Sequence, residues 1–293
     1  MWNRQPNKLA KLLRYSYAFF KEPVVSQPCG ATKSRFCCNW NCLLVAKLFT
    51  TAMTEGSNNG CATEISLIAC GSFNPVTYMH LRLFELARDF LRSQGKSVRR
   101  GYISPVSDGY GKKELVSAQH RLAMCKLAIS NSSWIEVLDW EADQPHWSPT
   151  VQVLKKYAKS LHCPGSSSKL MVLCGADFLE SFAITGLWKP EDIKTIVADY
   201  GLVVVTRPTY DPDKFIQNSD LLQELAANIF VVHQPFENDL SSTQIRRALR
   251  AKQSIRYLTP DPVIDYIVEN KLYSQIPEMN NEVLAPFRVN AKT

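Results

Sequence analysis

Two separated stretches of the chain combine residue types that bind phosphate. In the first, an apolar run ends at Gly71, and a polar turn leads to His80 at the start of a helical pattern of Leu81, Phe84, Leu86 and Phe90. A glycine lets a polyanion approach the backbone, and the free N–H groups of a helix start attract negative charge. In the second, hydroxyl residues at 241–243 precede a helix with Arg246 in its first turns. A cation there opposes the helix dipole, so a bound anion would relieve the conflict.

A third stretch repeats the pattern of the first. The apolar run 169–174 ends at Gly175, and Asp177 follows at the start of the next helix. Asp177 could cap that helix, the usual role of an aspartate there, and this role can coexist with a ligand contact at the edge of a sheet. Between the first and third stretches, the loop 104–113 holds two glycines and two lysines, which predicts either a mobile cationic loop over phosphates or an ordinary solvated loop.

Aromatic and polar residues alternate in the segment 139–150, which a core strand or helix seldom shows. A tryptophan in such a loop usually fills the underside of a core. The face of an indole also attracts a cation by about 0.5–2 kcal/mol, so Trp147 has a second interpretation as a ligand contact.

Strand-like apolar runs alternate with helical patterns along most of the chain, which predicts an α/β fold with a mostly parallel sheet and helices on both faces. The predicted strands lie at about 65–70, 98–103, 134–138, 169–174 and 201–207. The predicted helices lie at about 81–90, 118–129, 151–161, 191–200, from 242 onward, and at 261–268.

The net charge of +7 does not indicate nucleic-acid binding. Residues 1–52 hold eight Lys or Arg against the single acid Glu22, and the remaining 26 basic and 26 acidic residues cancel. The whole excess therefore belongs to a leader, and we expect no nucleic-acid partner. We predict three parts: a basic leader at 1–59, a domain at 60–274 and a flexible tail at 275–293.

The nine cysteines are too dispersed for a disulfide scaffold and lack paired zinc-ligand spacing, so we expect an intracellular protein with reduced thiols. The longest apolar run is interrupted at Lys47, so no membrane span is predicted.

The leader supports three interpretations. Its acid-poor, amphipathic pattern suits a mitochondrial transit peptide. It could equally be a disordered extension, with Met53 as a second start codon and a cytoplasmic core; nuclear entry stays open. Palmitoylation at Cys37, Cys38 or Cys42 is the weakest of the three.

Residues 71–80, with the pattern Gly-Ser-Phe-Asn-Pro-x-Thr-x-x-His, resemble the first signature of the nucleotidyltransferase superfamily. Met79 stands where the broad pattern has glycine, and the Thr-x-Met-His form resembles animal nicotinamide/nicotinate mononucleotide adenylyltransferases. The segment 240–246, Leu-Ser-Ser-Thr-Gln-Ile-Arg, is similar to that family's second signature, with leucine replacing isoleucine. The similarity runs from about Ile65 to Tyr273 and implies a Rossmann-like nucleotidyltransferase fold.

The resemblance also implies roles for individual residues. Catalysis would rest on His80, Arg246 and Lys112. The implied ATP-binding residues are Gly71, Ser72, Phe73, His80, Gly175, Asp177, Thr243 and Arg246, with Arg207 as a further candidate. The implied mononucleotide-binding residues are Ser72, Trp147, Thr150, Leu187, Trp188 and Asn238.

The implied reaction transfers AMP from ATP to nicotinamide mononucleotide, and to the nicotinic acid form, giving NAD or deamido-NAD and pyrophosphate. Mg²⁺ would be held by ATP phosphates and waters, with no protein ligand cage. Two alternatives stay open: another nucleotidyltransferase, acting on pantetheine phosphate or choline phosphate, and a chaperone or NAD-sensing module on the same fold. A homo-oligomer is compatible with the sequence.

Overall fold

The computed structural model describes residues 64–161, 168–236 and 238–274. The predictions for the leader at 1–59 and the tail at 275–293 fall outside these residues and stay predictions. Within the described part, no helix has the length and apolar character needed to cross a membrane.

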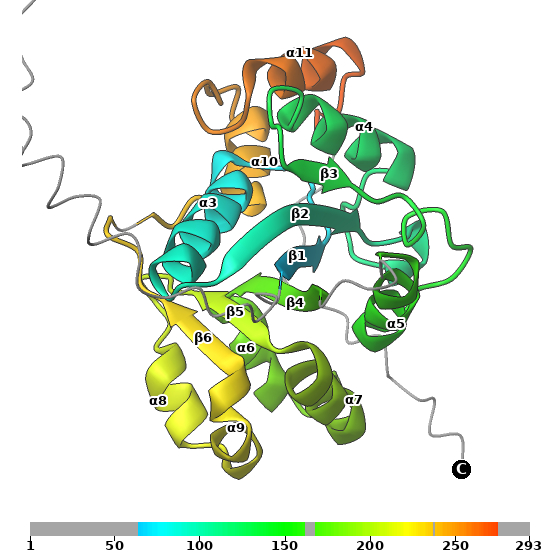
Figure 1. The fold of residues 1–293 in the computed structure, drawn as a ribbon. Helices are drawn as coiled ribbons and strands as arrows, with labels where there is room; N and C mark the ends of the chain where they lie inside the picture. The colour runs from blue at the N-terminus through cyan, green and yellow to red at the C-terminus, as the bar shows by residue number, and fades with distance from the viewer. Residues whose placement is uncertain (1–63, 162–167, 237, 275–293) are drawn as a thin grey trace, which may run out of the picture. The chain divides into compact units, whose positions relative to one another are not determined.

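The centre of the described part is a six-stranded parallel sheet (Figure 1). Its strand order is β3-β2-β1-β4-β5-β6. The strands are β1 (Glu64–Gly71), β2 (Ser97–Pro105), β3 (Ile135–Val137), β4 (Ser168–Gly175), β5 (Leu202–Val205) and β6 (Ile229–Val232). Every residue of β5 is buried, as expected for an apolar, β-branched strand covered on both faces.

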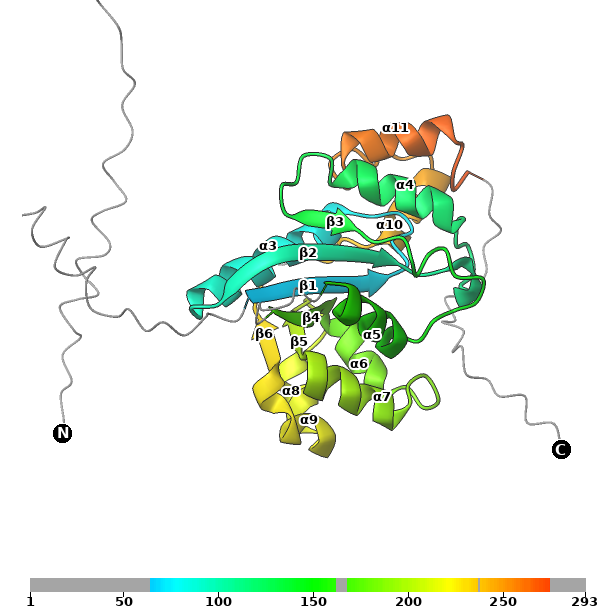
Figure 2. The same ribbon diagram turned by 45° about the vertical axis from the view of Figure 1, so that its right-hand side comes forward.

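Helices cover both faces of the sheet (Figure 2). One layer contains α3 (Tyr78–Ser93), α4 (Ala118–Ala128), α10 (Ser242–Arg250) and α11 (Asp261–Glu269). The other contains α5 (Thr150–Leu161), α6 (Ala176–Glu180), α7 (Pro190–Thr195), α8 (Pro212–Gln217) and α9 (Asp220–Glu224). This arrangement confirms the predicted Rossmann-like α/β fold.

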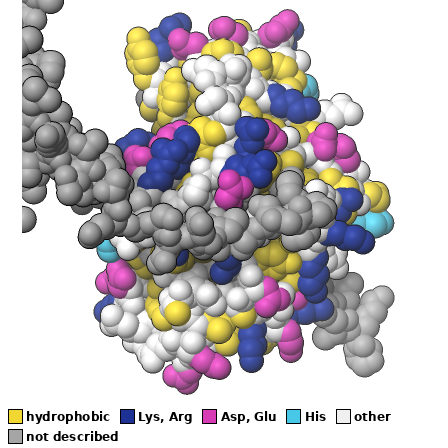
Figure 3. Space-filling view, viewed as in Figure 1, with side chains coloured by type: hydrophobic (Ala, Val, Ile, Leu, Met, Phe, Trp, Pro, Cys, Tyr) yellow, Lys and Arg dark blue, Asp and Glu magenta, His cyan; other side chains and the backbone are white. Residues whose placement is uncertain are grey.

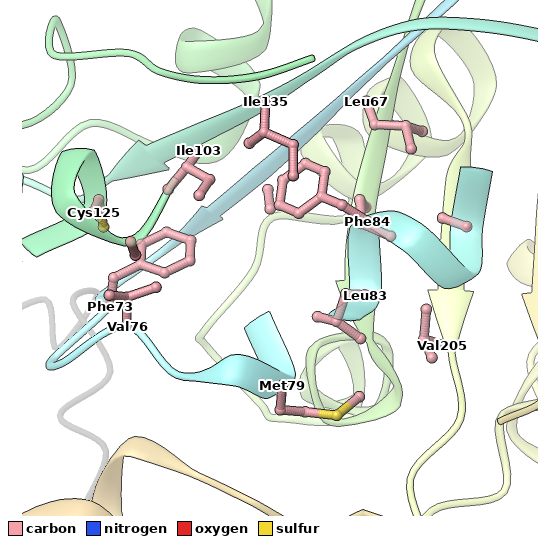
Figure 4. Close-up of a cluster of buried hydrophobic side chains, with 14 of the residues drawn as sticks. Leu67, Phe73, Val76, Met79, Leu83, Phe84, Ile103, Cys125, Ile135 and Val205 are labelled. Carbon is pink, nitrogen blue, oxygen red and sulfur yellow. The ribbon is translucent and has the colours of Figure 1, made fainter. Parts of the chain in front are cut away.

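A reciprocal cap fixes the start of α3. The Thr77 hydroxyl accepts from the backbone N–H of His80, and the His80 ring accepts from the backbone N–H of Thr77. The helix then buries Met79, Leu83 and Phe84, with others of the same face, against the sheet (Figure 4). Two of the four apolar residues that predicted this helix, Leu81 and Phe90, lie half-buried at the edge of that core.

A second core lies on the opposite face of the sheet. There β4 and β5 pack against apolar side chains of α5, α6 and α7, including Leu154, Leu179 and Ile193. The helix that follows β1, α3, covers one face of the sheet, and the helix that follows β4, α6, covers the other. The order of connections therefore reverses between these neighbouring strands. Parallel sheets of this kind bind ligands in the crevice at the carboxyl ends of the strands where the order reverses.

The structure differs from the sequence predictions in two regions. The predicted helix at 191–200 is α7 followed by a π-helical turn at Ile196–Tyr200. Residues 208–236, for which the sequence predicts no element, form α8, α9 and the edge strand β6. On the face seen in Figure 3, basic and acidic side chains lie among one another, in keeping with the charge balance outside the leader.

Candidate functional site

A cavity of about 520 Å³ lies at the carboxyl ends of β1 and β4. Its volume is within the range of small-molecule sites. The predicted residues that line it are Gly71, Ser72, Phe73, His80, Lys112, Trp147, Thr150, Gly175, Asp177, Leu187, Trp188 and Arg207. The fold therefore brings together residues from six separate segments of the chain.

The loop between β1 and α3 forms one wall of this cavity. Phe73 has a φ of 44°, in the left-handed region that residues with a Cβ seldom adopt. Its ring lies 5.1 Å from the ring of His80, measured between centroids. The next residue, Asn74, is fully buried and accepts from Tyr273 Oη at 2.8 Å and from Val116 N at 3.3 Å. The loop is thus held by residues distant in sequence.

His80 is an uncharged hydrogen-bond donor at neutral pH. Its Nδ1 accepts from the backbone N–H of Thr77 at 2.9 Å, which places the ring proton on Nε2. Burial, with the positive charges of Arg207 and Lys112 nearby, lowers the pKa of His80 to about 3. The Thr-x-x-His spacing therefore both caps the helix and fixes the tautomer of a ring that lines the cavity.

Gly175 and Asp177 form the opposite wall. The N-cap of α6 is Gly175, so Asp177 lies within the helix and the interpretation of its side chain as the cap is wrong. Its carboxylate instead faces Arg207, with Oδ1 3.6 Å from Nε. A Cβ at Gly175 would overlap that carboxylate, so a larger residue here would displace Asp177 from its present position. Arg207 Nε is buried without a hydrogen-bond partner among the described residues, which suits an anionic ligand.

Lys112 is close enough to both His80 and Arg246 to interact with them electrostatically. Burial and the nearby charge of Arg246 lower its pKa, while Asp177 acts in the opposite direction. Its own charge reaches His80. The loop that holds it is braced by Arg121, a fully buried guanidinium that donates to Val116 O at 2.8 Å and pairs with Asp108 at 3.1 Å.

An aromatic wall lies beside these charged groups. The rings of Trp147 and Tyr110 are 6.5 Å apart, and Gly109 approaches so closely that a Cβ would stand 2.6 Å from Trp147 N. Thr150 begins α5, so the positive end of that helix dipole is near the cavity. Trp147 therefore lines the cavity and does not fill the underside of a core.

A second tryptophan, Trp188, lies in the segment after α6 and lines the cavity. The ring of Trp188 packs edge-on against Phe178 and Phe182, with centroids 5.2 Å and 5.1 Å apart. Its Nε1 donates to Ser181 Oγ at 3.0 Å. These contacts fix the orientation of the indole beside the cavity.

Arg246 does not line the cavity. Its side chain is 7% exposed, pairs with Glu114 at 3.1 Å and donates to Asn74 O at 2.9 Å. Arg250 binds the other oxygen of Glu114 at 3.0 Å. Burial alone would raise the pKa of Glu114, but the hydrogen bonds from both arginines lower it below its ordinary value. In this structure, the anion that the sequence predicts beside Arg246 is a carboxylate of the chain itself.

Two further predicted site residues also lie outside the cavity. Thr243 is half-buried in the first turn of α10. Asn238 Oδ1 accepts from Leu240 N at 3.0 Å, and the residue lines a separate hollow of about 680 Å³ with Tyr78, Trp134 and Phe236. That hollow is larger, but Gly71, His80 and Lys112 are absent from its lining.

Sequence reasoning missed three polar residues that line the cavity or brace the loops beside it. Glu114 and Arg121 lie in a loop and a helix whose patterns predict solvated side chains, and their partners are remote in sequence. Glu141 is 2% exposed and lines the cavity. It lies in the aromatic and polar segment 139–150, whose unusual composition was the available signal.

Comparisons of sequence place the chain among known proteins. A family model described as cytidylyltransferase-like matches residues 68–248. The chain is 45% identical over 269 residues to nicotinamide/nicotinic acid mononucleotide adenylyltransferase 1 of Bos taurus, covering 78% of this chain and 96% of that protein. It is 44% identical over 228 residues to the nicotinamide/nicotinic acid mononucleotide adenylyltransferase of Arabidopsis thaliana, covering 76% of this chain and 96% of that protein.

A comparison of structures agrees on the fold. The chain resembles the Plasmodium falciparum nicotinic acid mononucleotide adenylyltransferase complexed with NaAD, with a TM-score of 0.53 and 22% sequence identity. The match covers 72% of this chain and 97% of that one.

Proposed function

The chain belongs to the family of nicotinamide/nicotinic acid mononucleotide adenylyltransferases. We propose that its cavity is the site at which AMP is transferred from ATP to nicotinamide mononucleotide or nicotinic acid mononucleotide. The products are NAD or deamido-NAD and pyrophosphate. One observation carries this proposal: phosphate-type groups (Gly71, His80, Lys112) and two indoles (Trp147, Trp188) line one cavity where the sheet order reverses.

The reaction needs positioning more than proton transfer. A 5′-phosphate oxygen of the mononucleotide forms a bond to the α-phosphorus of ATP, and the bond from that phosphorus to the bridging oxygen breaks. The electron pair leaves with pyrophosphate. Since the nucleophile is already an anion, no general base is required, and fixed donors and cations carry the rate.

His80 suits the role of a fixed donor to the phosphates. Its protonated Nε2 and neutral ring supply a hydrogen bond without a proton that can be lost at neutral pH. Lys112 and Arg207 place positive charge in the same cavity, which Lys189 also lines. Arg207 makes only a long ion pair with Asp177, at 3.6 Å, and its Nε has no hydrogen-bond partner among the described residues, so its guanidinium can bind an incoming triphosphate.

The role proposed for Arg246 and Thr243 in triphosphate binding requires a rearrangement. Glu114 holds the guanidinium of Arg246 in this structure, so a phosphate would have to replace that carboxylate. Lys112, two residues before Glu114, is near enough to sense the charge of Arg246. Movement of this loop would then shift Lys112 and release the guanidinium of Arg246 from Glu114 at the same time.

Mg²⁺ is proposed as the ion that accompanies ATP. Asp177 is a half-exposed carboxylate at the cavity, which fits this arrangement. Mg²⁺ keeps several waters and takes one or two carboxylates, so Asp177 would accept from those waters. The ion would neutralise charge on the phosphates.

The two tryptophans account for the choice of acceptor. A pyridine ring attached to ribose is a cation, and the faces of Trp147 and Trp188 would attract it by about 0.5–2 kcal/mol each.

The test is an assay of the full chain with ATP, Mg²⁺ and each acceptor in turn. Nicotinamide mononucleotide and nicotinic acid mononucleotide should each give a dinucleotide and one pyrophosphate. Pantetheine phosphate and choline phosphate should give neither product. Transfer to one of the latter pair, with no dinucleotide from the pyridine nucleotides, would refute the proposed substrates.

A further inference from the structure

One buried acid in the cavity has no role in the reaction described above. Glu141 follows β3, is 2% exposed and lines the cavity. Ser104 Oγ donates to its Oε2 at 2.5 Å. An acid is seldom this buried unless it is paired with a cation, and Glu141 makes no ion pair within the described residues.

Glu141 belongs to the aromatic side of the cavity. Trp147 and Thr150, which line the same wall, follow it in one continuous segment. Burial and the charge of Glu141 together raise the pKa of Tyr110, whose ring is packed beside that of Trp147. The charge of Glu141 therefore reaches the wall at which the pyridine ring is proposed to bind.

The surroundings of Glu141 leave its two protonation states close in free energy at neutral pH. Burial raises its pKa to about 7, although the hydrogen bond from Ser104 and the charge of Arg121 act in the opposite direction. The titratable groups coupled to it come from β1, the turn after β2, α4 and α5: Cys70, Tyr110, Arg121 and Tyr157. Of these four, Arg121 alone carries a charge at neutral pH.

The two mononucleotides differ only in the substituent on the pyridine ring, which is a neutral carboxamide in one and a carboxylate in the other. We propose that Glu141 determines the preference between them, because its ionised form repels the acidic mononucleotide and accepts a hydrogen bond from the amide. This inference rests on the proposed function, since it assumes that the ring binds between Trp147 and Trp188.

A dependence on pH follows with a definite sign. Below about pH 7, Glu141 is protonated, and the repulsion of the carboxylate substituent disappears. Above it, Glu141 is ionised and disfavours the acid. The ratio of kcat/KM for the acidic mononucleotide to kcat/KM for the amide should therefore fall as pH rises. The shared phosphate and ribose cancel in this ratio.

The experiment compares the full-length wild-type chain with E141Q, and uses E136Q as a matched control. Glu136 is an exposed acid on β3 that pairs with Arg100 away from the cavity. For each protein, kcat/KM is measured with both mononucleotides from pH 6 to 8.5. The wild type and E136Q should show a ratio that falls by about tenfold over this range, because Glu141 passes from mostly protonated to almost fully ionised and a like charge then disfavours the acid. E141Q should show a high ratio that does not change.

Each outcome bears on one hypothesis. A wild-type ratio that is constant with pH overturns the role of Glu141, whether or not the variant folds. A ratio that falls equally in E141Q also overturns it. If the wild type forms no dinucleotide from either mononucleotide, the proposed function itself fails, which the assay distinguishes from a failure of this inference.

Discussion

Helices α3 and α10 begin with the same capping box but present their functional side chains differently. In α3 the residue that closes the box is His80, which also lines the cavity. In α10 the box is closed by the exposed Gln244, and Arg246 farther along the helix is turned toward Asn74 and Glu114. The same local motif therefore places one side chain against the ligand space and the other inside the protein.

The two regions also manage charge in opposite ways. Burial keeps His80 neutral, so it needs no counterion. Arg246 keeps its charge and is compensated by Glu114. The cations that line the cavity in this structure are Lys112, Lys189 and Arg207, whereas Arg246 of the second motif is held by Glu114 and Asn74.

The largest effect should come from H80A. Loss of a fixed donor to the reacting phosphates should lower kcat by about 100- to 1,000-fold, the usual cost of one such donor. Loss of the reciprocal cap should cost only about 1 kcal/mol of stability. Steady-state kinetics and urea unfolding measure both, and full activity in a folded H80A would contradict the role of His80.

The next largest effect should come from R246A, and here on stability. The variant leaves Asn74 O without its donor and Glu114 with one arginine instead of two, so the free energy of unfolding should fall by about 3 kcal/mol. R247A, which removes an exposed arginine of the same helix, is the control. Equal stability of R246A and R247A would remove the contrast between the two helices.

A smaller effect is expected for W188A. Removing the indole should weaken binding of the mononucleotide by about 0.5–2 kcal/mol, with ATP binding less changed. Isothermal titration with each substrate measures the split. W140A removes a partly buried indole that does not line the cavity and serves as the control. An equal loss of affinity for both substrates in W188A would argue against a specific contact with the pyridine ring.

No change at all is expected when His80 is followed by NMR between pH 8 and 5. Its pKa of about 3 lies below the ordinary value of 6.5, so the ring stays neutral in this range. The unfolded chain protonates this histidine below about pH 6.5, whereas the folded chain does not until about pH 3. The free energy of unfolding should therefore fall as pH is lowered from about 6.5 toward 3. Titration of the His80 ring near pH 6.5 would contradict the assignment of His80 as a buried donor that is neutral at this pH.

Much of the fold could be predicted from local patterns. The apolar run before Gly71, the apolar run before Gly175 and the continuous strand β5 are each apparent from hydrophobicity alone. The edge strand β6 was missed because it is short and only its last residue, Val232, is buried. Edge strands lack the strong pattern that burial on both faces imposes.

The site could be predicted less completely, because much of it depends on distant partners. Glycines at strand ends and the Thr-x-x-His spacing are local signals, and both motifs lead to the cavity. The orientation of Arg246 depends on Glu114, 132 residues away in sequence. A buried cation compensated in this way has the same local sequence as one that faces a ligand.

The central claim is that the cavity at β1 and β4, and not the larger hollow beside α3, holds the nucleotides. A crystal structure of the chain with the dinucleotide product bound tests it most directly. The claim predicts the pyridine ring at Trp147 and Trp188 and the phosphates within reach of His80 and Lys112. Density for the product in the hollow lined by Tyr78, Trp134 and Phe236, with the cavity empty, would contradict it.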